Sequence, residues 1–495
     1  MKKQNIFNIM IYILMFIALL SIIIIKPIND LDEIWNYNFA RNVANGLVPY
    51  RDFNMLQMPL LPIICSIFLK FITNKLVIIR ILAAFLCSGI IFVIYKLFGL
   101  LNIKKEIGII FCFIIGYLFV DCFCIDYNFA TLLIVLLMIY IEIKLYKKDN
   151  NFIKVIPSSE LILGILAGLT VTLKQTTGLL VCVALLGNKL LFVREKNQFK
   201  IYLKSFLYRL VGILIPIALM LIYLILNNAF GDFISYTIKG ISGFSNYISY
   251  KNLIKFNIIG GFAILVPLTF FYQWYSTIIM ERNKEKYILL VYGLAIFVVA
   301  FPISNKIHFL IGATPTIILI LYSLYNLLYR LYNKLNKLKK SIIIISYLMY
   351  AFIILFTVCY SGRNLYKYLN NRDKFSKLSS YNYISINKNL ENQIINIGNY
   401  ILTSKENVKI LDATAAIYMI PIDKYNKDYD MLLKGNLGEN GEEILIKDIE
   451  QSKDTKYLVL KDEYSKNWQT PLNIIKYVTN NKTKTGEIEI FNIYE

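Results

Sequence analysis

Long apolar runs recur along about the first 360 residues and constrain the fold more than any other feature of the sequence. A helix needs about 20 apolar residues to cross the roughly 30 Å hydrocarbon core of a bilayer. Runs near this length with few charges lie at about 6–25, 76–98, 107–125, 128–145, 160–173, 178–193, 209–227, 256–280, 288–303, 308–328 and 341–360. The pattern predicts a polytopic α-helical membrane protein with about 11 transmembrane helices.

The composition excludes an ordinary soluble protein. Of the 495 residues, 57% are hydrophobic and 17% are charged, whereas soluble domains carry about 25% charged residues. The formal net charge of +21 does not indicate nucleic acid, because the lysines and arginines lie in short loops between the apolar runs. We therefore expect the lipid bilayer as a partner and no nucleic acid.

The basic loops predict the orientation of the chain. Loops near 104–105, 147–154, 194–204, 282–286 and 330–340 are rich in lysine and arginine, and the alternate loops are less basic. Because basic loops stay on the cytoplasmic side, we expect the N-terminus inside and the C-terminus outside the cell membrane. The first run ends in IIIIKP without a small-residue cleavage site, which favours a retained helix over a signal peptide. The stretch at 59–72 is too short to span and predicts a re-entrant or interfacial helix.

The character of the sequence changes after about residue 363. NVKILDAT, KYLVL and EIEIFNIY predict short strands, and helical patterns lie near 386–401 and 470–480. GNLGENG at 435–441 lacks the Lys-Ser/Thr of a phosphate loop and is interpreted as an ordinary loop. We predict a transmembrane domain over 1–362, with a first outward loop at 26–75, and a small extracytoplasmic α/β domain over 363–495.

The outward loop begins with an unusually charged stretch, DLDEIWNYNFARNVANGLVPYRDF. Apolar residues at helical spacing predict an amphipathic helix on the membrane surface, at Leu31, Trp35, Phe39 and Val43. Asp30 and Glu33 have the spacing of a capping box, which gives both a structural explanation. Asp32 has none. An ionised carboxylate beside the outer leaflet suits proton abstraction during transfer from a lipid-borne donor to an outward acceptor.

Further polar residues lie where predicted outward loops meet the apolar runs. They are Asp121 and Asp126 in VDCFCIDYNF, Lys174 and Gln175 in GLTVTLKQTTG, and Lys306 and His308 in FPISNKIHFLIGATP. A lone outward lysine is more often an interfacial anchor than a ligand. The gathering of such clusters on one predicted face, with little equivalent acid on the other, favours a functional site.

The order of several short motifs carries a resemblance to a known family. They are Asp32-Glu33, Ala40-Arg41, the turn at Gly46–Pro49, and Pro59-Leu60. The chain resembles the GT-C glycosyltransferases that use polyprenyl-phosphate sugars, which include the protein mannosyltransferases and the lipid A aminoarabinose transferase. PYRDFNMLQMPLLP, LKQTTG and FPISNKIHFLIGATP look like a bacterial subgroup of family 39-like enzymes. Gln57-Met58 stands where the aminoarabinose transferases have Glu-Lys, so another cation would have to contact the phosphate.

The resemblance implies an enzyme that moves a sugar from a polyprenyl phosphate to an extracytoplasmic glycan, lipid or protein of the cell envelope. It implies inversion at the anomeric carbon, with no metal and no cofactor beyond the lipid-linked donor. We expect Asp32 to act as general base, with Glu33 in support and Asp126 or Asp121 near the acceptor. The expected phosphate-binding residues are Lys174, His308, Arg51 and Lys306. Asp30, Gln57 and Gln175 are expected near the site.

Two other functions fit a polytopic chain. A transporter or lipid-linked-glycan flippase would place ionisable groups near the middle of the membrane and show two related halves. A glycan polymerase or ligase would carry an outward loop rich in arginine and histidine late in the chain, and only one histidine is present. The charges lie mainly at the ends of the apolar runs, which favours the transferase over both.

Overall fold

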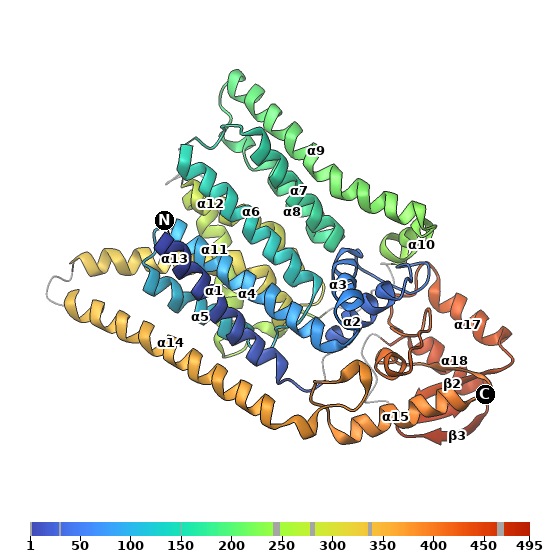
Figure 1. The fold of residues 1–495 in the computed structure, drawn as a ribbon. Coiled ribbons are helices and arrows are strands. Elements are labelled where there is room, and N and C mark those ends of the chain that lie inside the picture. The colour runs from blue at the N-terminus through green and yellow to red at the C-terminus, as the bar shows by residue number, and fades with distance from the viewer. Residues whose placement is uncertain are drawn as a thin grey trace. The chain divides into compact units, whose positions relative to one another are not determined.

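The computed structural model of the protein describes residues 2–28, 31–149, 151–240, 248–277, 283–334, 339–462 and 470–495. They form two compact units, each assembled from segments far apart in the sequence (Figure 1). The first unit contains Met1–Ile23, Ala83–Met220 and Tyr247–Leu365. The second contains Ile24–Leu82, Leu221–Asn246 and Tyr366–Glu495.

The first unit is built from long apolar helices. They are α1 (Lys2–Ile24), α4 (Leu76–Leu100), α5 (Lys105–Phe119), α6 (Tyr127–Asp149), α7 (Pro157–Leu173), α8 (Gln175–Gly187), α9 (Lys196–Leu226), α11 (Ile258–Tyr275), α12 (Lys284–Phe297), α13 (Lys306–Lys334) and α14 (Lys339–Asn370), several of which continue past the unit boundary. Among the described residues, 8 helical segments are long and apolar enough to cross a membrane. The chain is therefore a multi-pass membrane protein.

Each predicted apolar run coincides with a helix, but not every helix reaches spanning length. α5, α7 and α12 have 15, 17 and 14 residues, and a short helical turn extends α12 to Ala300. The expected total of about 11 crossings therefore stays a prediction. The stretch at 59–72 forms α3 (Leu60–Phe71), a helix of 12 residues that is too short to span, as predicted.

Small residues let two helices of the first unit cross closely. Gly164 and Gly168 lie one turn apart on α7, and a Cβ on Gly212 of α9 would come within 2.9 Å of the Gly164 Cα. Such small-xxx-small spacing allows backbones to approach in a bilayer, where lipid removes the hydrophobic drive for helix association. The α7–α9 contact therefore depends on glycine at these positions.

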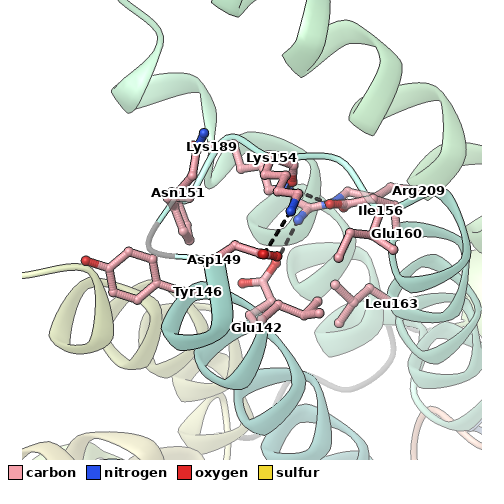
Figure 2. A pocket seen from close by; sticks show the side chains of 12 residues that line it. Glu142, Tyr146, Asp149, Asn151, Lys154, Ile156, Glu160, Leu163, Lys189 and Arg209 are labelled. Carbon is pink, nitrogen blue, oxygen red and sulfur yellow. Dashed lines mark hydrogen bonds and ion pairs between the residues drawn. The ribbon is translucent and has the colours of Figure 1, made fainter.

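A buried ionic network joins four helices of the same unit, and Figure 2 shows the small pocket that its charged side chains line. Arg209 of α9 donates from Nε to Glu160 of α7 at 2.5 Å and from Nη2 to Glu142 of α6 at 2.8 Å. Its Nη1 donates to Asn188, just after α8, at 2.7 Å. Lys189 Nζ reaches the other Glu160 oxygen at 2.5 Å. We call these five side chains the Arg209 network; it contains two carboxylates and two cations.

Several residues in or beside the basic loops contact one another in the first unit. Lys147 Nζ lies 3.2 Å from Glu285 Oε1, and Lys189 Nζ lies 3.3 Å from the carbonyl oxygen of Lys154. Lys284 Nζ lies 3.0 Å from the ring centroid of Phe192. The predicted alternation of loops, with the basic loops in the cytoplasm, stays a prediction.

The second unit combines short helices with one four-stranded sheet. Its elements are α2 (Leu31–Ala44), α3, α10 (Phe230–Ile234), α15 (Lys388–Thr403), α16 (Ala416–Met419), α17 (Gly441–Gln451), α18 (Leu472–Asn481), β1 (Asn407–Ile410), β2 (Thr455–Leu460), β3 (Lys484–Ile488) and β4 (Phe491–Tyr494). The strand order is β1-β2-β4-β3. β1 and β2 are parallel, with Asn407 opposite Thr455, and the β3–β4 hairpin is antiparallel.

The predicted strands and helices of the C-terminal region are present. EIEIFNIY divides into β3 and β4 because Glu489, which has φ +47°, turns the chain between them. The GNLGENG run is a loop up to Asn440, and α17 begins at its last glycine. The small α/β fold is therefore as predicted, whereas its placement outside the cell stays a prediction.

Helix α2 is buried more completely than an amphipathic surface helix. Asn36 and Asn42, which lie off the apolar stripe, are 6% and 1% exposed. C-terminal segments contact this helix within the second unit: Trp35 Nε1 donates to Ala413 O at 3.0 Å, and Arg41 pairs with Asp423. The sequence pattern predicted the helix correctly but not these contacts, because the contacting segments come from almost 380 residues later in the chain.

Candidate functional site

Lys174 occupies the corner between α7 and α8, two helices that pack against each other. Its extended backbone (φ −148°, ψ 105°) ends α7, and its N–H donates to Thr170 O at 2.9 Å. Gly178 then lies so close to the backbone of Val171 that any side chain there would overlap it. The sequence LKQTTG therefore folds as a tight corner that presents Lys174 at the end of the helix pair.

The Lys174 ammonium lies beside the start of α6. Its Nζ donates to Asn128 Oδ1 at 2.7 Å and lies 5.5 Å from the centroid of the Tyr127 ring. The Asn128 backbone N–H in turn donates to Asp126 Oδ1 at 2.7 Å. An ammonium has three N–H donors, and Asn128 takes one of them. This arrangement suits an anionic ligand such as a phosphate, which forms strong charge-assisted hydrogen bonds.

Burial moves both charged groups of this pair toward neutrality. It lowers the pKa of Lys174 to about 8, although the nearby Asp126 carboxylate opposes the change. Burial also raises the pKa of Asp126, against the opposing effects of the Asn128 N–H and the Lys174 charge. Lys174 is therefore mainly protonated at neutral pH and becomes neutral only a little above it.

His308 lies in the first turn of α13, next to this pair. Asn305, which precedes the helix, accepts the His308 backbone N–H on its Oδ1 at 3.0 Å, and the same oxygen lies 2.8 Å from His308 Nδ1. Lys174 is close enough to interact electrostatically with the imidazole. The structure thus brings Asp126, Lys174 and His308 together in the first unit, from three predicted outward loops.

Two other predicted residues form a surface pair in the first unit. Lys306 Nζ lies 3.3 Å from Asp121 Oδ2, and both side chains are substantially exposed, by 40% and 80%. Exposed ion pairs of this kind contribute about 0–1 kcal/mol. Gln175 is the first residue of α8 and is half-buried. The Lys306–Asp121 geometry is that of a surface ion pair.

Glu33 of the second unit has a structural partner that sequence analysis missed. Arg80 Nε donates to Glu33 Oε1 at 2.8 Å and Arg80 Nη2 donates to Glu33 Oε2 at 2.9 Å, with both side chains buried. Arg80 also donates to the carbonyl oxygens of Ile24, Lys26 and Pro27. This bidentate pair fixes the start of α2 against the end of α1 and the start of α4.

Asp32 lies in the first turn of α2, beside this anchor. It is half-buried, and its carbonyl oxygen accepts Asn36 Nδ2 at 2.8 Å. A carboxylate in the first turn of a helix is stabilised in its ionised form by the helix dipole. The role of Asp32 as general base stays a prediction. Asp30, also expected near the site, lies outside the described residues.

Arg51 is engaged by its own neighbourhood in the second unit. Its Nε and Nη2 each donate to the Asp52 carboxylate at 2.8 Å, and Nη1 donates to Asn227 O at 3.1 Å. The pair with Arg51 lowers the pKa of Asp52. Gln57 is buried, and its carbonyl oxygen accepts the Tyr50 hydroxyl at 2.6 Å. These contacts shape the loop after α2 and weaken the case for Arg51 as a phosphate ligand.

Three residues that position the site were missed from the sequence, although each carried a signal. Arg80 interrupts the apolar run LVIIRILAAF, and a charge in such a run requires a partner. Asn128 lies two residues after Asp126 in DYNF, the spacing at which an aspartate side chain accepts a backbone N–H. Asn305 precedes α13 at the position where asparagine caps helices.

Comparison with known proteins supports a common fold and no closer relationship. No protein-family profile and no curated protein matches the sequence. The crystal structure of the oligosaccharyltransferase from Archaeoglobus fulgidus in its apo form superposes with a TM-score of 0.52 and 11% identity, over 92% of this chain and 69% of that chain. The chain therefore shares the fold of that archaeal protein over most of its length.

Two further structures of the archaeal protein superpose less well. The structure of AglB from Archaeoglobus fulgidus with an inhibitory peptide and a dolichol-phosphate gives a TM-score of 0.46 at 13% identity, over 81% of this chain and 58% of that chain. The complex with Zn and sulfate gives a TM-score of 0.41 at 12% identity, over 79% of this chain and 55% of that chain.

Proposed function

We propose that the protein is an integral-membrane glycosyltransferase that moves a sugar from a polyprenyl-phosphate donor to an extracytoplasmic acceptor. The observation that carries this proposal is the oligosaccharyltransferase fold, which covers 92% of the chain. The cluster of Asp126, Lys174 and His308 supports it, because an anionic lipid-linked donor needs a cation near its phosphate. The family 39-like assignment, the metal-independent course and the bacterial cell envelope rest on the resemblance of the motifs.

The proposed reaction forms one bond and breaks another at the anomeric carbon. The acceptor hydroxyl oxygen attacks that carbon from the face opposite the phosphate, and the bond to the phosphate oxygen breaks, so the configuration inverts. The resemblance of the motifs assigns the hydroxyl proton to Asp32 of the second unit. The contacts of Lys174 within the first unit assign to it the negative charge that develops on the departing polyprenyl phosphate. In this assignment Glu33 supports the base by holding α2 through Arg80.

A transporter is the alternative that the Arg209 network would favour, because buried charges in a membrane segment often mark a transport path. However, Arg209 donates to Glu160, Glu142, Asn188 and the Leu185 carbonyl oxygen, so four of its five N–H donors are engaged. The network is also balanced in charge. Charges that are balanced and bonded to one another hold helices together, which favours the transferase.

Phosphate binding is expected to depend on Lys174 and on pH. Lys174→Met should weaken binding of undecaprenyl phosphate by more than about 1 kcal/mol, the scale of a charge-assisted hydrogen bond. Because burial lowers the pKa of Lys174 to about 8, wild-type affinity should fall as the pH rises through that value and the ammonium loses its proton. Titration of purified protein in nanodiscs with undecaprenyl phosphate at several pH values measures both effects.

Lys174→Arg is the matched control for this prediction. A guanidinium stays charged throughout the range, so the variant should retain affinity above pH 8, where the wild type loses it. Equal affinity in wild type and Lys174→Met, with no change through pH 8, would remove Lys174 from the phosphate site.

The proposal places the second unit outside the cell, with 363–495 as an extracytoplasmic domain. Three of the segments assigned to the outer face by the charge pattern, near 26–75, 231–251 and after 363, fall largely within this one unit, which supports the assignment. In a Cys359→Ser background, which removes the exposed native thiol, cysteine at the exposed Lys424 should react with an impermeant maleimide on intact cells. Cysteine at the exposed Asn197 should react only after lysis. The reverse pattern would invert the topology.

A further inference from the structure

The hydrogen bonds around Asn305 determine which ring nitrogen of His308 carries the proton. The His308 backbone N–H points to one side-chain atom of Asn305, at 3.0 Å. A backbone N–H can only donate, so that atom must be the amide oxygen and not the amide nitrogen. The same oxygen lies 2.8 Å from Nδ1 of the imidazole. Because an amide oxygen only accepts, Nδ1 must be the protonated nitrogen.

The opposite nitrogen, Nε2, is then a hydrogen-bond acceptor. A neutral imidazole has one N–H donor, and Nδ1 uses it on Asn305. The ring lies in the first turn of α13, where the positive end of the helix dipole disfavours an imidazolium. A neutral ring in this tautomer presents a lone pair, and a lone pair repels a phosphate oxygen. This geometry disagrees with the expected phosphate-binding role of His308.

We infer that His308 Nε2 accepts a hydrogen bond from a hydroxyl of the sugar on the lipid-linked donor. The inference rests on the proposed function. Lys174, which interacts electrostatically with His308, supplies the cation for the phosphate, and the sugar is bonded directly to that phosphate. A hydroxyl is the group of the donor that can donate to a lone pair. His308 is thereby a residue that recognises the sugar, and Lys174 is the residue that recognises the phosphate.

The tautomer can be measured directly because the chain contains a single histidine. Protein grown with ¹⁵N-labelled histidine and reconstituted in nanodiscs gives one imidazole in a nitrogen NMR spectrum. We expect a protonated Nδ1 and an unprotonated Nε2 in the unliganded protein. Undecaprenyl phosphate alone should leave Nε2 unprotonated and nearly unshifted. Undecaprenyl phosphate carrying glucose, mannose or arabinose should shift Nε2 for the sugar that the site accepts.

Three substitutions of His308 separate an acceptor from a phosphate ligand. His308→Gln places an amide oxygen near the position of Nε2, and His308→Asn keeps a donor toward Asn305 but loses the group at Nε2. His308→Lys replaces the acceptor with a cation. We expect His308→Asn and His308→Lys to lose about tenfold in affinity for the accepted sugar lipid, the worth of one hydrogen bond. His308→Gln should stay within a few fold, and no variant should weaken binding of undecaprenyl phosphate alone.

A protonated Nε2 in the free protein, or protonation of Nε2 by undecaprenyl phosphate alone, would overturn the inference. So would a His308→Lys variant that binds the sugar lipid as well as the wild type while His308→Gln does not. These results would leave the proposed transferase intact. If the wild type binds none of the three sugar lipids more tightly than undecaprenyl phosphate, sugar recognition by this site is refuted. If membranes that contain the wild-type protein also consume none of the three sugar lipids, the proposed function is refuted.

Discussion

Asp32→Asn is expected to insert and fold normally and to lose about 10²–10⁴-fold in sugar transfer, the usual contribution of a positioned general base. The substitution keeps the size and hydrogen-bonding shape of the side chain but removes the proton acceptor. The helix that carries it is anchored independently, because the Glu33–Arg80 pair holds the first turn of α2. Each variant is expressed in a deletion strain, whose membranes supply the native acceptor. The rate is measured as the consumption of radiolabelled sugar lipid by these membranes.

Asp30→Asn is the control, since asparagine caps a helix nearly as well as aspartate. This variant should turn over at close to the wild-type rate, with any cost confined to stability. A fully active Asp32→Asn protein, together with an inactive Asp126→Asn protein, would transfer the role of base to Asp126. That result would leave the fold and the phosphate assignment unchanged.

Arg209→Met is expected to destabilise the first unit by about 3–5 kcal/mol, because it leaves buried carboxylates without their main partner. Glu142 and Glu160 have side chains only 3% exposed, and Arg209 contacts both. Methionine has a similar length and apolar character, so the loss reflects charge more than packing. The unfolding transition of the purified protein in detergent, compared between variant and wild type, measures the cost.

Lys154→Met is the matched control for this substitution. Its ammonium pairs with Asp149 at 2.8 Å at the edge of the same pocket, but the lysine side chain is 51% exposed. The loss should be no more than about 1 kcal/mol. Equal stability of the two variants would mean that the Arg209 network contributes little to holding the helices of the first unit together. Increased stability of Arg209→Met would point to a role in function that is maintained at a cost to the fold.

The membrane part of the fold could be predicted from the sequence because apolar length is a local property. Every predicted run became a helix, including α3, which was correctly judged too short to span. Which segments of the chain assemble into the second unit could not be predicted in the same way. Trp35 and Arg41 find partners in Ala413 and Asp423, and no local pattern in a single sequence reports a pairing over such a separation.

The candidate site was predictable in its residue types and less so in its roles. Asp126, Lys174 and His308 were selected because they end apolar runs on one predicted face, and they do lie together. Their chemistry depends on neighbours whose identity the spacing did not reveal. Asn305 determines which nitrogen of His308 is protonated, and Arg80 makes Glu33 a structural residue. Partners of this kind become visible only with side-chain geometry.

The pairing of α2 with C-terminal segments has a consequence for synthesis of the chain. Trp35 leaves the ribosome 378 residues before Ala413, the residue whose carbonyl oxygen its indole contacts. Membrane insertion of the helices between them proceeds while the polar side chains of α2 lack their final partners. We therefore expect the second unit to mature after translation is nearly complete, with the early loop vulnerable to proteases and dependent on chaperones until the last segments arrive.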